Sequence, residues 1–544
     1  MIKPQKIPTI PRDTTRVIRA ILPKGNAITR LRDEFGTIYT DQDFATLFST
    51  TGQPAIAPWK LALITVFQFF ENLTDRQAVH AVLTRIDWKY ALSLKLTDPS
   101  FDHTVLSEFR SRLVNGNQEL VLLNKMLEVF NAKGLLKTRG RQRTDSTHIL
   151  SSARVMQRLE HVTETVRAAL NALATSHPEW TRGMANPAWF ERYSKRAEDY
   201  HLPKGKQSRE DFVSTVGDDG YALLELIGSA QAPKGASDLP AVDALRRTWM
   251  LEYIHEEGRS RWRNADEIGP ASERFNSPYD TDAHHGVKGS RNWDGYKVHL
   301  TETCDANTPN LITHVMTTGA TLTDVECTQV IEEALISKGL QPGEHVVDGA
   351  YVSAALLVSS QKRGTSLIGP ARPMQGWQAN TPGAYDLTKF KVNFKTRSVI
   401  CPQGKKSASW KDKRKRNRIH VEFRRADCEA CQFRALCLKP LHGARSLSIL
   451  PRVEFEATQA QRALNATPGW AERFDARAGI EGSLSQGVRA FGLRRSRFVG
   501  EARTRLHCVG VAVGVNVQRV GAWLEGVPRA KSRVSRFAAL RAAA

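Results

Sequence analysis

The chain has 544 residues, of which 41% are hydrophobic and 25% charged, a composition that excludes a disordered or collagen-like protein and allows roughly two to four folded domains. Lysine and arginine number 78 against 56 acidic residues, and the resulting charge of +22 favours a polyanionic partner, above all nucleic acid, over a protein that is merely solubilised by its charge. The first residues lack an apolar signal segment, and the most apolar stretch, residues 59–70, is too short to span a membrane. We therefore expect a cytoplasmic protein, associated with the nucleoid if the cell is bacterial.

The N-terminal quarter of the chain is predicted to be helical after a short arm. Residues 1–40 are polar and contain prolines, which indicates an extended arm, whereas residues 41–136 show helical spacing of apolar side chains. Pro58 suits the first turn of one helix, Thr74 can cap the next, and residues 101–113 form an amphipathic helix whose arginines lie off its apolar face. Such a module fits a DNA reader of the helix-turn-helix kind, and a helical bundle with merely solvated arginines fits it equally well.

Strand and helix patterns alternate in three separate stretches, which together predict an α/β core with a mixed sheet. These stretches are residues 137–153, 285–370 and 471–525. Their predicted strands are residues 144–149, 296–301, 311–316, 344–347 and 366–369, and a helix is predicted over residues 323–338. Between the stretches lie a helical insertion (154–284) and a basic, cysteine-containing insertion (371–470), and a basic tail follows (526–544).

Three acidic residues of this core stand where a metal site would need them. Asp145 lies on a predicted strand, Asp348 directly follows a short buried strand, and Glu481 lies between glycines at the start of a helix. A carboxylate beside a buried strand is costly unless it is paired or binds a cation. Carboxylates that converge from strand ends and one helix can hold two divalent ions about 4 Å apart, and oxygen ligands favour Mg²⁺ or Mn²⁺. The helix before Asp348 carries competitors, so the pattern alone leaves the choice open. The competitors are Glu326, Glu332 and Glu333.

Four motifs resemble those of one known family. They are RTDSTH at 143–148, WDGYKVH at 293–299, VDGAY at 347–351 and RAGIEGSLSQG at 477–487. With them, the chain resembles the DDE transposases of bacterial insertion sequences, in particular the long members whose third acid lies in a Tyr-x2-Arg-x3-Glu-x6-Lys signature. Two runs that begin at Gly52 and Glu71 resemble the N-terminal domain of that family, so the likeness extends from about residue 40 to about residue 520.

The resemblance implies a fold and an activity. The fold would be an RNase H-like core, a five-stranded mixed sheet flanked by helices. Asp145, Asp348 and Glu481 would be its catalytic residues and would bind two Mg²⁺ or Mn²⁺ ions for DNA cleavage and strand transfer. The chain would bind the terminal inverted repeats of its own element and its target DNA, most simply as a homodimer.

The resemblance also suggests DNA contacts near the third acid. Arg477 falls at the signature arginine and would contact a DNA phosphate, and Arg495 and Arg497 lie further along the same segment. Phe474 replaces the signature tyrosine, and Arg489 stands one place after the signature lysine. Because a phenyl ring cannot donate a hydrogen bond, the tyrosine's phosphate contact is absent or replaced.

The insertion over residues 371–470 carries four of the seven cysteines. They are Cys401, Cys428, Cys431 and Cys437. A Cys-x2-Cys pair with two further cysteines fits a closed structural zinc site, and reduced, unligated thiols fit about as well. An odd number of cysteines without a secretion signal does not favour a disulfide framework.

A basic run separates Cys401 from Cys428. Runs of this kind are commonly only solvated, but in a DNA enzyme they hold the phosphate backbone without reading its sequence. The expected contacts are Lys411, Lys413, Arg414 and Arg416.

Two other functions fit the same sequence. One is a catalytically impaired transposase remnant that acts as a DNA-binding protein or repressor and binds DNA ends without Mg²⁺-dependent cleavage. The other is an RNase H-like nuclease that cuts DNA without strand transfer.

Overall fold

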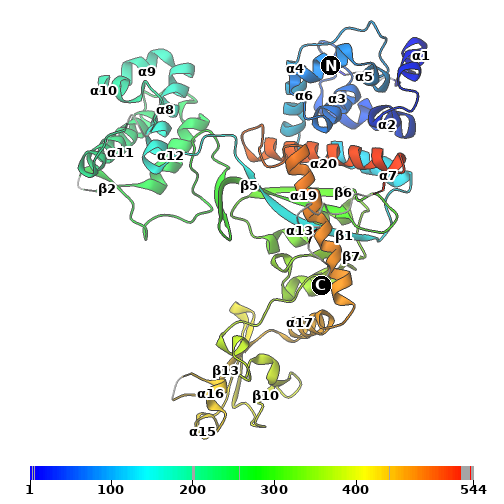
Figure 1. Ribbon diagram of the computed structural model, residues 1–544. Coiled ribbons are helices and arrows are strands. Elements are labelled where there is room, and N and C mark those ends of the chain that lie inside the picture. Colours follow the sequence, from blue (N-terminus) through cyan, green and yellow to red (C-terminus); the bar gives the residue numbers. More distant parts are fainter. Residues whose placement is uncertain are drawn as a thin grey trace.

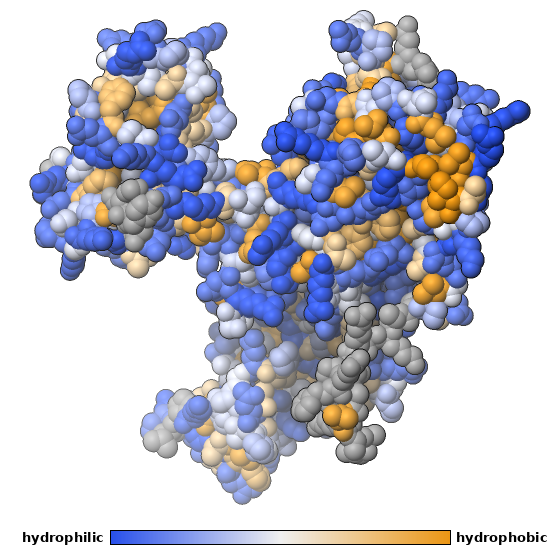
Figure 2. All heavy atoms as spheres, turned by 45° about the horizontal axis from the view of Figure 1, so that its top comes forward, coloured by the Kyte–Doolittle hydropathy of each residue, from blue (hydrophilic) through white to orange (hydrophobic). Residues whose placement is uncertain are grey.

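The computed structural model describes residues 1–528 and residue 540, apart from residues 3, 5, 199–201, 257 and 440–441. Figure 1 shows N-terminal helices (blue) above a sheet, a helical lobe to the left and a smaller β-rich part at the bottom. In the space-filling view of Figure 2 the helical lobe stands apart from the rest of the molecule. The basic tail predicted over residues 526–544 lies mostly outside the described residues. Within the described residues, no helix has both the length and the apolar character needed to traverse a bilayer.

The N-terminal part is helical almost from its start, so the extended arm predicted over residues 1–40 is wrong. Its helices are α1 (Arg12–Ile21), α2 (Ala27–Phe35), the 3-10 turn η1 (Asp41–Leu47), α3 (Pro58–Phe70), α4 (Asp75–Thr84), α5 (Ile86–Ala91), α6 (Thr104–Asn115) and α7 (Val121–Ala132). Asn26 caps α2, and Ile28, Leu31 and Phe35 are buried along one face of it. This stripe is too short to stand out among the polar residues around it.

Helix α3 is buried on nearly every side, which explains its apolar sequence. Pro58 is its first residue, as predicted, and Thr74 caps α4 by accepting the backbone N–H of Gln77 at 3.3 Å. Helix α3 packs against the long C-terminal helix α20 (Glu501–Leu524). One apolar core runs from these helices to the sheet, so the N-terminal part and the sheet are packed as a unit.

The centre of the molecule is a mixed sheet. Its strands are β1 (Arg141–Leu150), β4 (His284–Lys288), β5 (Arg291–Thr303), β6 (Ile312–Gly319), β7 (Glu344–Val347) and β8 (Ser366–Ile368). Five of them follow the order β6-β5-β1-β7-β8, and β4 pairs with the first residues of β5. Strand β5 is antiparallel to β1 and β6, whereas β1, β7 and β8 run parallel to one another. The predicted strands are confirmed, and β4 was not predicted.

Helices cover both faces of this sheet, which makes the core α/β as predicted. Val315 and Met316 are consecutive residues of β6 and therefore point to opposite faces. Val315 belongs to the core that α20 and α19 (Gly479–Ala490) help to form, and Met316 packs with α13 (Asp324–Ser337) and α14 (Ala354–Lys362).

The insertion after β1 has an apolar core of its own. Its elements are α8 (Arg158–Ser176), α9 (Pro178–Met184), α10 (Pro187–Tyr193), α11 (Lys206–Gly228), η3 (Ala236–Asp238), α12 (Pro240–Glu252), β2 (Tyr253–Glu256) and β3 (Arg259–Trp262). Trp189 and Trp249 are buried in this core. The β2–β3 hairpin was not predicted. Its two strands are only four residues long, and the stacked rings of Tyr253 and Trp262 join them.

The second insertion is a small β-rich module. Its elements are η5 (Trp377–Asn380), η6 (Leu387–Lys389), β9 (Lys391–Asn393), β10 (Ser398–Ile400), β11 (Ser409–Lys413), η7 (Arg414–Arg416), β12 (Arg418–Glu422), α15 (Arg425–Glu429), α16 (Arg434–Cys437) and β13 (Ser446–Ile449). Its small separate core comprises Phe390, Val399, Ile419, Val421, Phe423, Leu447 and Ile449. Helices α17 (Arg452–Asn465) and α18 (Trp470–Asp475) follow, and α17 packs on α14.

Candidate active site

Asp145 and Asp348 start from neighbouring positions on adjacent parallel strands. Strand β1 pairs with β7 in a register that sets Thr144 opposite Val347, so each aspartate is the next residue after this pair. Adjacent strands lie about 4.8 Å apart, which keeps the two backbones close. The register therefore brings together two acids that are far apart in the sequence.

Burial and a like charge act on Asp145. Its side chain is 11% exposed, and burial raises the pKa of its carboxyl group above the usual range, as does the negative charge of Asp348. The guanidinium of Arg477 acts in the opposite direction. Asp348 caps the 3-10 turn η4 (Gly349–Tyr351), where its carboxylate accepts the backbone N–H of Ala350 at 2.8 Å. A cation near both acids would relieve the repulsion between them.

Glu481, on α19, is linked to Asp145 by an arginine that contacts both carboxylates. Arg477 contacts Asp145 with Nη1, 3.1 Å from Oδ2, and Glu481 with Nη2, 2.7 Å from Oε1. Ile480 and Leu484 are buried under α19, so the intervening Glu481 points away from the core and its side chain is 61% exposed. One guanidinium thus joins two of the three predicted acids.

A buried ion cluster fixes α19 to the sheet. Glu302 on β5 is fully buried, and its carboxylate contacts the guanidinium of Arg143 at 2.5 Å, the hydroxyl of Ser483 at 2.5 Å and the guanidinium of Arg519 at 2.7 Å. Arg143 also donates to the carbonyl of Ala476, in the turn η8 (Ala476–Ala478) before α19, at 2.5 Å. This cluster sets the distance between the helix that carries the third acid and the strand that carries the first.

Asp324 is a further acid near the site, and the sequence analysis missed it. It is the first residue of α13, is 8% exposed, and lies 3.4 Å from Nζ of Lys297 and 3.4 Å from the hydroxyl of Ser146, the neighbour of Asp145. In the sequence it follows a capping threonine, a position where an acid normally serves only the helix end.

The three competing glutamates have other partners. Glu326 completes a capping box with Thr323. Glu332 is buried and bound by Arg363 at 2.7 Å, and Glu333 is exposed and hydrogen-bonded within its own helix. Because the competing glutamates already serve these structural contacts, Asp145, Asp348 and Glu481 are the better candidates for metal ligands.

The donor set suits a hard divalent cation, because all three acids offer carboxylate oxygens. As the side chains stand, no group of three or more His, Cys, Asp or Glu side chains among the described residues is close enough to hold a metal ion. Arg477 supplies the positive charge between Asp145 and Glu481 instead.

The predicted DNA-contacting arginines after Glu481 divide into two kinds. All three are exposed, and Arg489 and Arg495 form no ion pair within the part of the chain that the structure describes. Arg497 donates to the carbonyl of Leu73 at 2.7 Å and contacts the side chain of Asn72. It therefore fastens the C-terminal part to the N-terminal helices. Spacing in the sequence could not show which arginines have such partners.

The basic face predicted for the helix over residues 101–113 needs a similar correction. Arg110 on α6 is buried, 2.6 Å from the carboxylate of Asp75, and it donates to the side chain of Gln68 at 3.2 Å. Arg112 is exposed. The helix thus offers fewer exposed cations than its sequence suggests.

Phe474 contacts Arg477. The Arg477 guanidinium lies 5.8 Å from the centre of the Phe474 ring, and this ring stacks on Trp470 at 5.3 Å. The aromatic residue at this position therefore contacts the arginine that bridges the acids.

The basic candidates of the second insertion lie on β11 and in the turn η7 that joins it to β12, and we call them the hairpin cations. They are Lys411, Lys413, Arg414 and Arg416. All four are exposed, and none forms an ion pair within the described part of the chain. They are free to meet an external polyanion.

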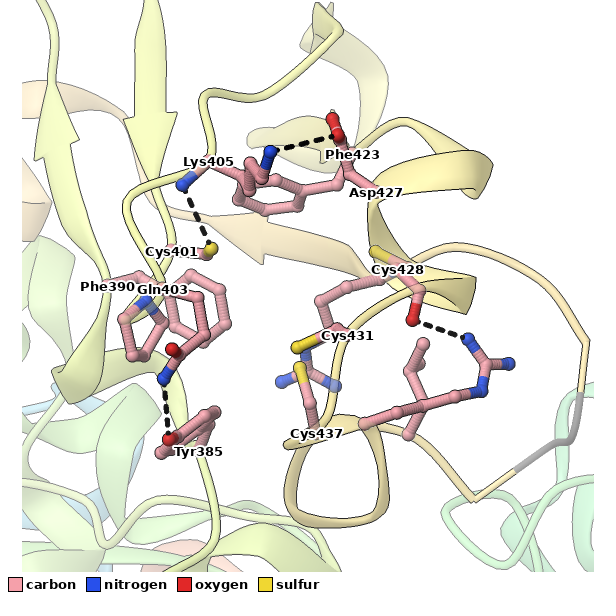
Figure 3. A pocket seen from close by; sticks show the side chains of 14 residues that line it. Tyr385, Phe390, Cys401, Gln403, Lys405, Phe423, Asp427, Cys428, Cys431 and Cys437 are labelled. Carbon is pink, nitrogen blue, oxygen red and sulfur yellow. Dashed lines mark hydrogen bonds and ion pairs between the residues drawn. The ribbon is translucent and has the colours of Figure 1, made fainter.

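The four cysteines predicted to act together do line one cavity (Figure 3). Cys401, Cys428, Cys431 and Cys437 contribute to its wall. All seven cysteines lie in the described part of the chain, and all have free thiols.

Two family models match the chain. One, described as a transposase DDE domain, matches residues 400–521, which include Glu481 and most of the β-rich module. The other, described as a transposase domain, matches residues 16–112 in the N-terminal helices. Asp145 and Asp348 lie outside both matches. No curated protein and no solved structure matches the chain.

Proposed function

Because the chain belongs to the DDE transposases of insertion sequences, we propose that it binds the terminal inverted repeats of its element and cuts and joins DNA with divalent ions held by Asp145, Asp348 and Glu481. The observation that supports this most is the parallel register of β1 and β7, which sets the two aspartates side by side. The contacts of Arg477 to both Asp145 and Glu481 support placing the third acid, Glu481, in the same site.

We also propose that the core is RNase H-like. In support, the five-strand order β6-β5-β1-β7-β8 has β5 as the strand antiparallel to both of its neighbours. Among these five strands, Asp145 lies on the first in chain order and Asp348 directly after the fourth, while Glu481 lies on the late helix α19.

Each residue has a role in the proposed reaction. Asp145, Asp348 and Glu481 would hold Mg²⁺ or Mn²⁺, which would activate a water or 3′-hydroxyl at neutral pH and stabilise the leaving oxygen. A cation would stabilise the charged form of Asp145, whose pKa is raised by burial and by Asp348. Arg477 releases the carboxylates and turns to a DNA phosphate when the site fills, while Glu302 keeps α19 in place.

The hairpin cations, with the exposed Arg489 and Arg495, are the proposed contacts to the DNA backbone. The N-terminal helices are the proposed reader of the element ends. Since the two ends of an element must be cut and joined together, we propose a homodimer on DNA, which light scattering of the protein–DNA complex tests.

The test of this function is the substitution Asp348→Asn, with Glu333→Gln as the control. Glu333 is an exposed acid on the preceding helix. Loss of a residue that only supports a metal ligand costs about 10–100-fold, so loss of a ligand should lower Mg²⁺-dependent cleavage of an element end by more than about 100-fold. End binding should persist, and Glu333→Gln should cut normally.

The other two functions predict different results. If wild-type protein binds element ends but does not cut them in Mg²⁺ or Mn²⁺, the chain is a DNA-binding remnant. If it cuts the ends but yields no joined products, it is a nuclease. Cleavage by Asp348→Asn at the wild-type rate would contradict the site.

A further inference from the structure

The cavity between the four cysteines of the second insertion is small. Cys401 follows β10, Cys428 and Cys431 flank the end of α15, and Cys437 ends α16, so three segments meet here. Figure 3 shows the sulfur atoms on the walls of this space. Its volume is about 40 Å³, enough for a few water molecules or an ion, whereas pockets for organic ligands begin at about 300 Å³.

Backbone N–H groups donate to two of the sulfur atoms, an arrangement that stabilises negative charge on them. The N–H of Lys405 donates to Sγ of Cys401 at 3.3 Å, and the N–H of Arg445 donates to Sγ of Cys428 at 3.4 Å. The first bond closes a tight turn in which Gly404 has a φ of +79°, a conformation that favours glycine. Hydrogen bonds of this kind orient the ligands of a metal site and stabilise their charge.

Cations line the same cavity. The side chains of Lys405, Arg434 and Arg445 all border it. A divalent metal with four thiolate ligands carries a net negative charge, and three neighbouring cations compensate such a charge. Lys405 also pairs with Asp427 at 3.6 Å, which holds its ammonium group beside the cavity.

The module also needs a source of stability other than its core. That core is small, and Cys401, Cys428 and Cys437 already pack against it. A closed tetrahedral site contributes folding free energy directly, which suits a segment with few buried apolar side chains.

We propose that Cys401, Cys428, Cys431 and Cys437 bind one structural Zn²⁺ ion in this cavity. Four thiolates favour zinc over a hard cation such as Mg²⁺. As the side chains stand, no three metal-binding groups in the described part of the chain are within coordinating reach of one another. Zinc binding therefore requires the cysteine side chains to turn inward, until each sulfur lies about 2.3 Å from the ion. The proposal does not depend on the catalytic site.

The test is the metal content of the purified full-length protein, prepared without added metal or chelator. The wild type should contain about one zinc ion per chain. Cys428→Ser and Cys437→Ser should each lose it, because each removes one ligand. Cys304→Ser is the matched control, since Cys304 is a partly buried thiol outside the module and should not affect the zinc content.

A second measurement covers the case in which the serine variants do not fold. Wild-type protein grown with Co²⁺ in place of zinc should show the sulfur-to-cobalt charge-transfer bands of tetrahedral thiolate coordination. Wild-type protein with well under one zinc per chain and four rapidly reacting thiols in the module would overturn the proposal. So would retention of zinc by both serine variants. None of these measurements uses DNA, so a negative result would leave the proposed transposase activity untouched.

Discussion

Replacing Gly479 by alanine tests whether α19, the helix that carries Glu481, must lie close to β1. Gly479 has ordinary helical angles, φ −65° and ψ −24°, so its backbone tolerates alanine. A methyl group there would lie 2.5 Å from Nη2 of Arg143 and closer still to Nη1. Gly482, on the same helix and on the other side of Glu481, has no neighbour within 4 Å of the added carbon. The two glycines give a clash variant and its matched control.

The Arg143 guanidinium cannot simply move aside. It binds the carboxylate of Glu302 and the carbonyl of Ala476, and the Arg143 and Glu302 side chains are 8% and 0% exposed. Separating this buried pair costs about 3–5 kcal/mol. If α19 moves outward instead, Glu481 leaves Asp145, and a displacement of about 1 Å costs about 100-fold in rate. Either response impairs the site.

Thermal unfolding and single-turnover cleavage of a DNA end in Mg²⁺ distinguish the two variants. Gly479→Ala should unfold several degrees lower or cut about 100-fold more slowly. Gly482→Ala should cut normally and gain about 0.5–1 kcal/mol, since alanine favours helix over glycine. If Gly479→Ala matched Gly482→Ala in both measurements, the packing of α19 against Arg143 would be refuted.

Three further predictions follow from the same contacts. The pKa of Asp145 is raised in the folded chain, so the metal-free protein should lose stability as the pH rises through that pKa. In EDTA, Asp145→Asn should therefore have a higher melting temperature than wild type at neutral pH but not at acidic pH. Equal melting temperatures at every pH would contradict this prediction. Glu302→Ala should cost about 3–5 kcal/mol in urea unfolding, because it leaves Arg143 and Arg519 buried without their anion, whereas removing the exposed Glu179 should have no measurable effect. Replacing the hairpin cations with glutamine should make the plot of log binding constant against log salt concentration less steep. Its slope should change by about 0.9 for each phosphate that the protein no longer neutralises. An unchanged slope would exclude these residues from the DNA interface.

Features of the fold that depend on residues adjacent in the sequence could be predicted from it. The strand Glu344–Val347 agrees with its prediction because a short apolar run between turn residues is a local signal. Thr74 was identified as a cap for the same reason. The failures were also local: α2 and the β2–β3 hairpin are short elements whose patterns are weak.

The contacts that organise the candidate site could not be predicted in this way. Arg143 and Glu302 are 159 residues apart, and Ser483 is 181 residues from Glu302. Such pairs follow from strand pairing and helix packing, which one sequence does not specify. Asp324 was missed for a similar reason, since only the fold brings it close to Ser146.

The central claim is that three acids far apart in the chain hold the same divalent ions. Replacing Mg²⁺ with Fe²⁺, in the presence of ascorbate and peroxide, generates radicals that cut the polypeptide beside the bound metal. The account predicts cuts near residues 145, 348 and 481, which excess Mg²⁺ suppresses and Asp348→Asn abolishes. Cuts confined to other segments, or cuts at these positions that excess Mg²⁺ leaves unchanged, would contradict it.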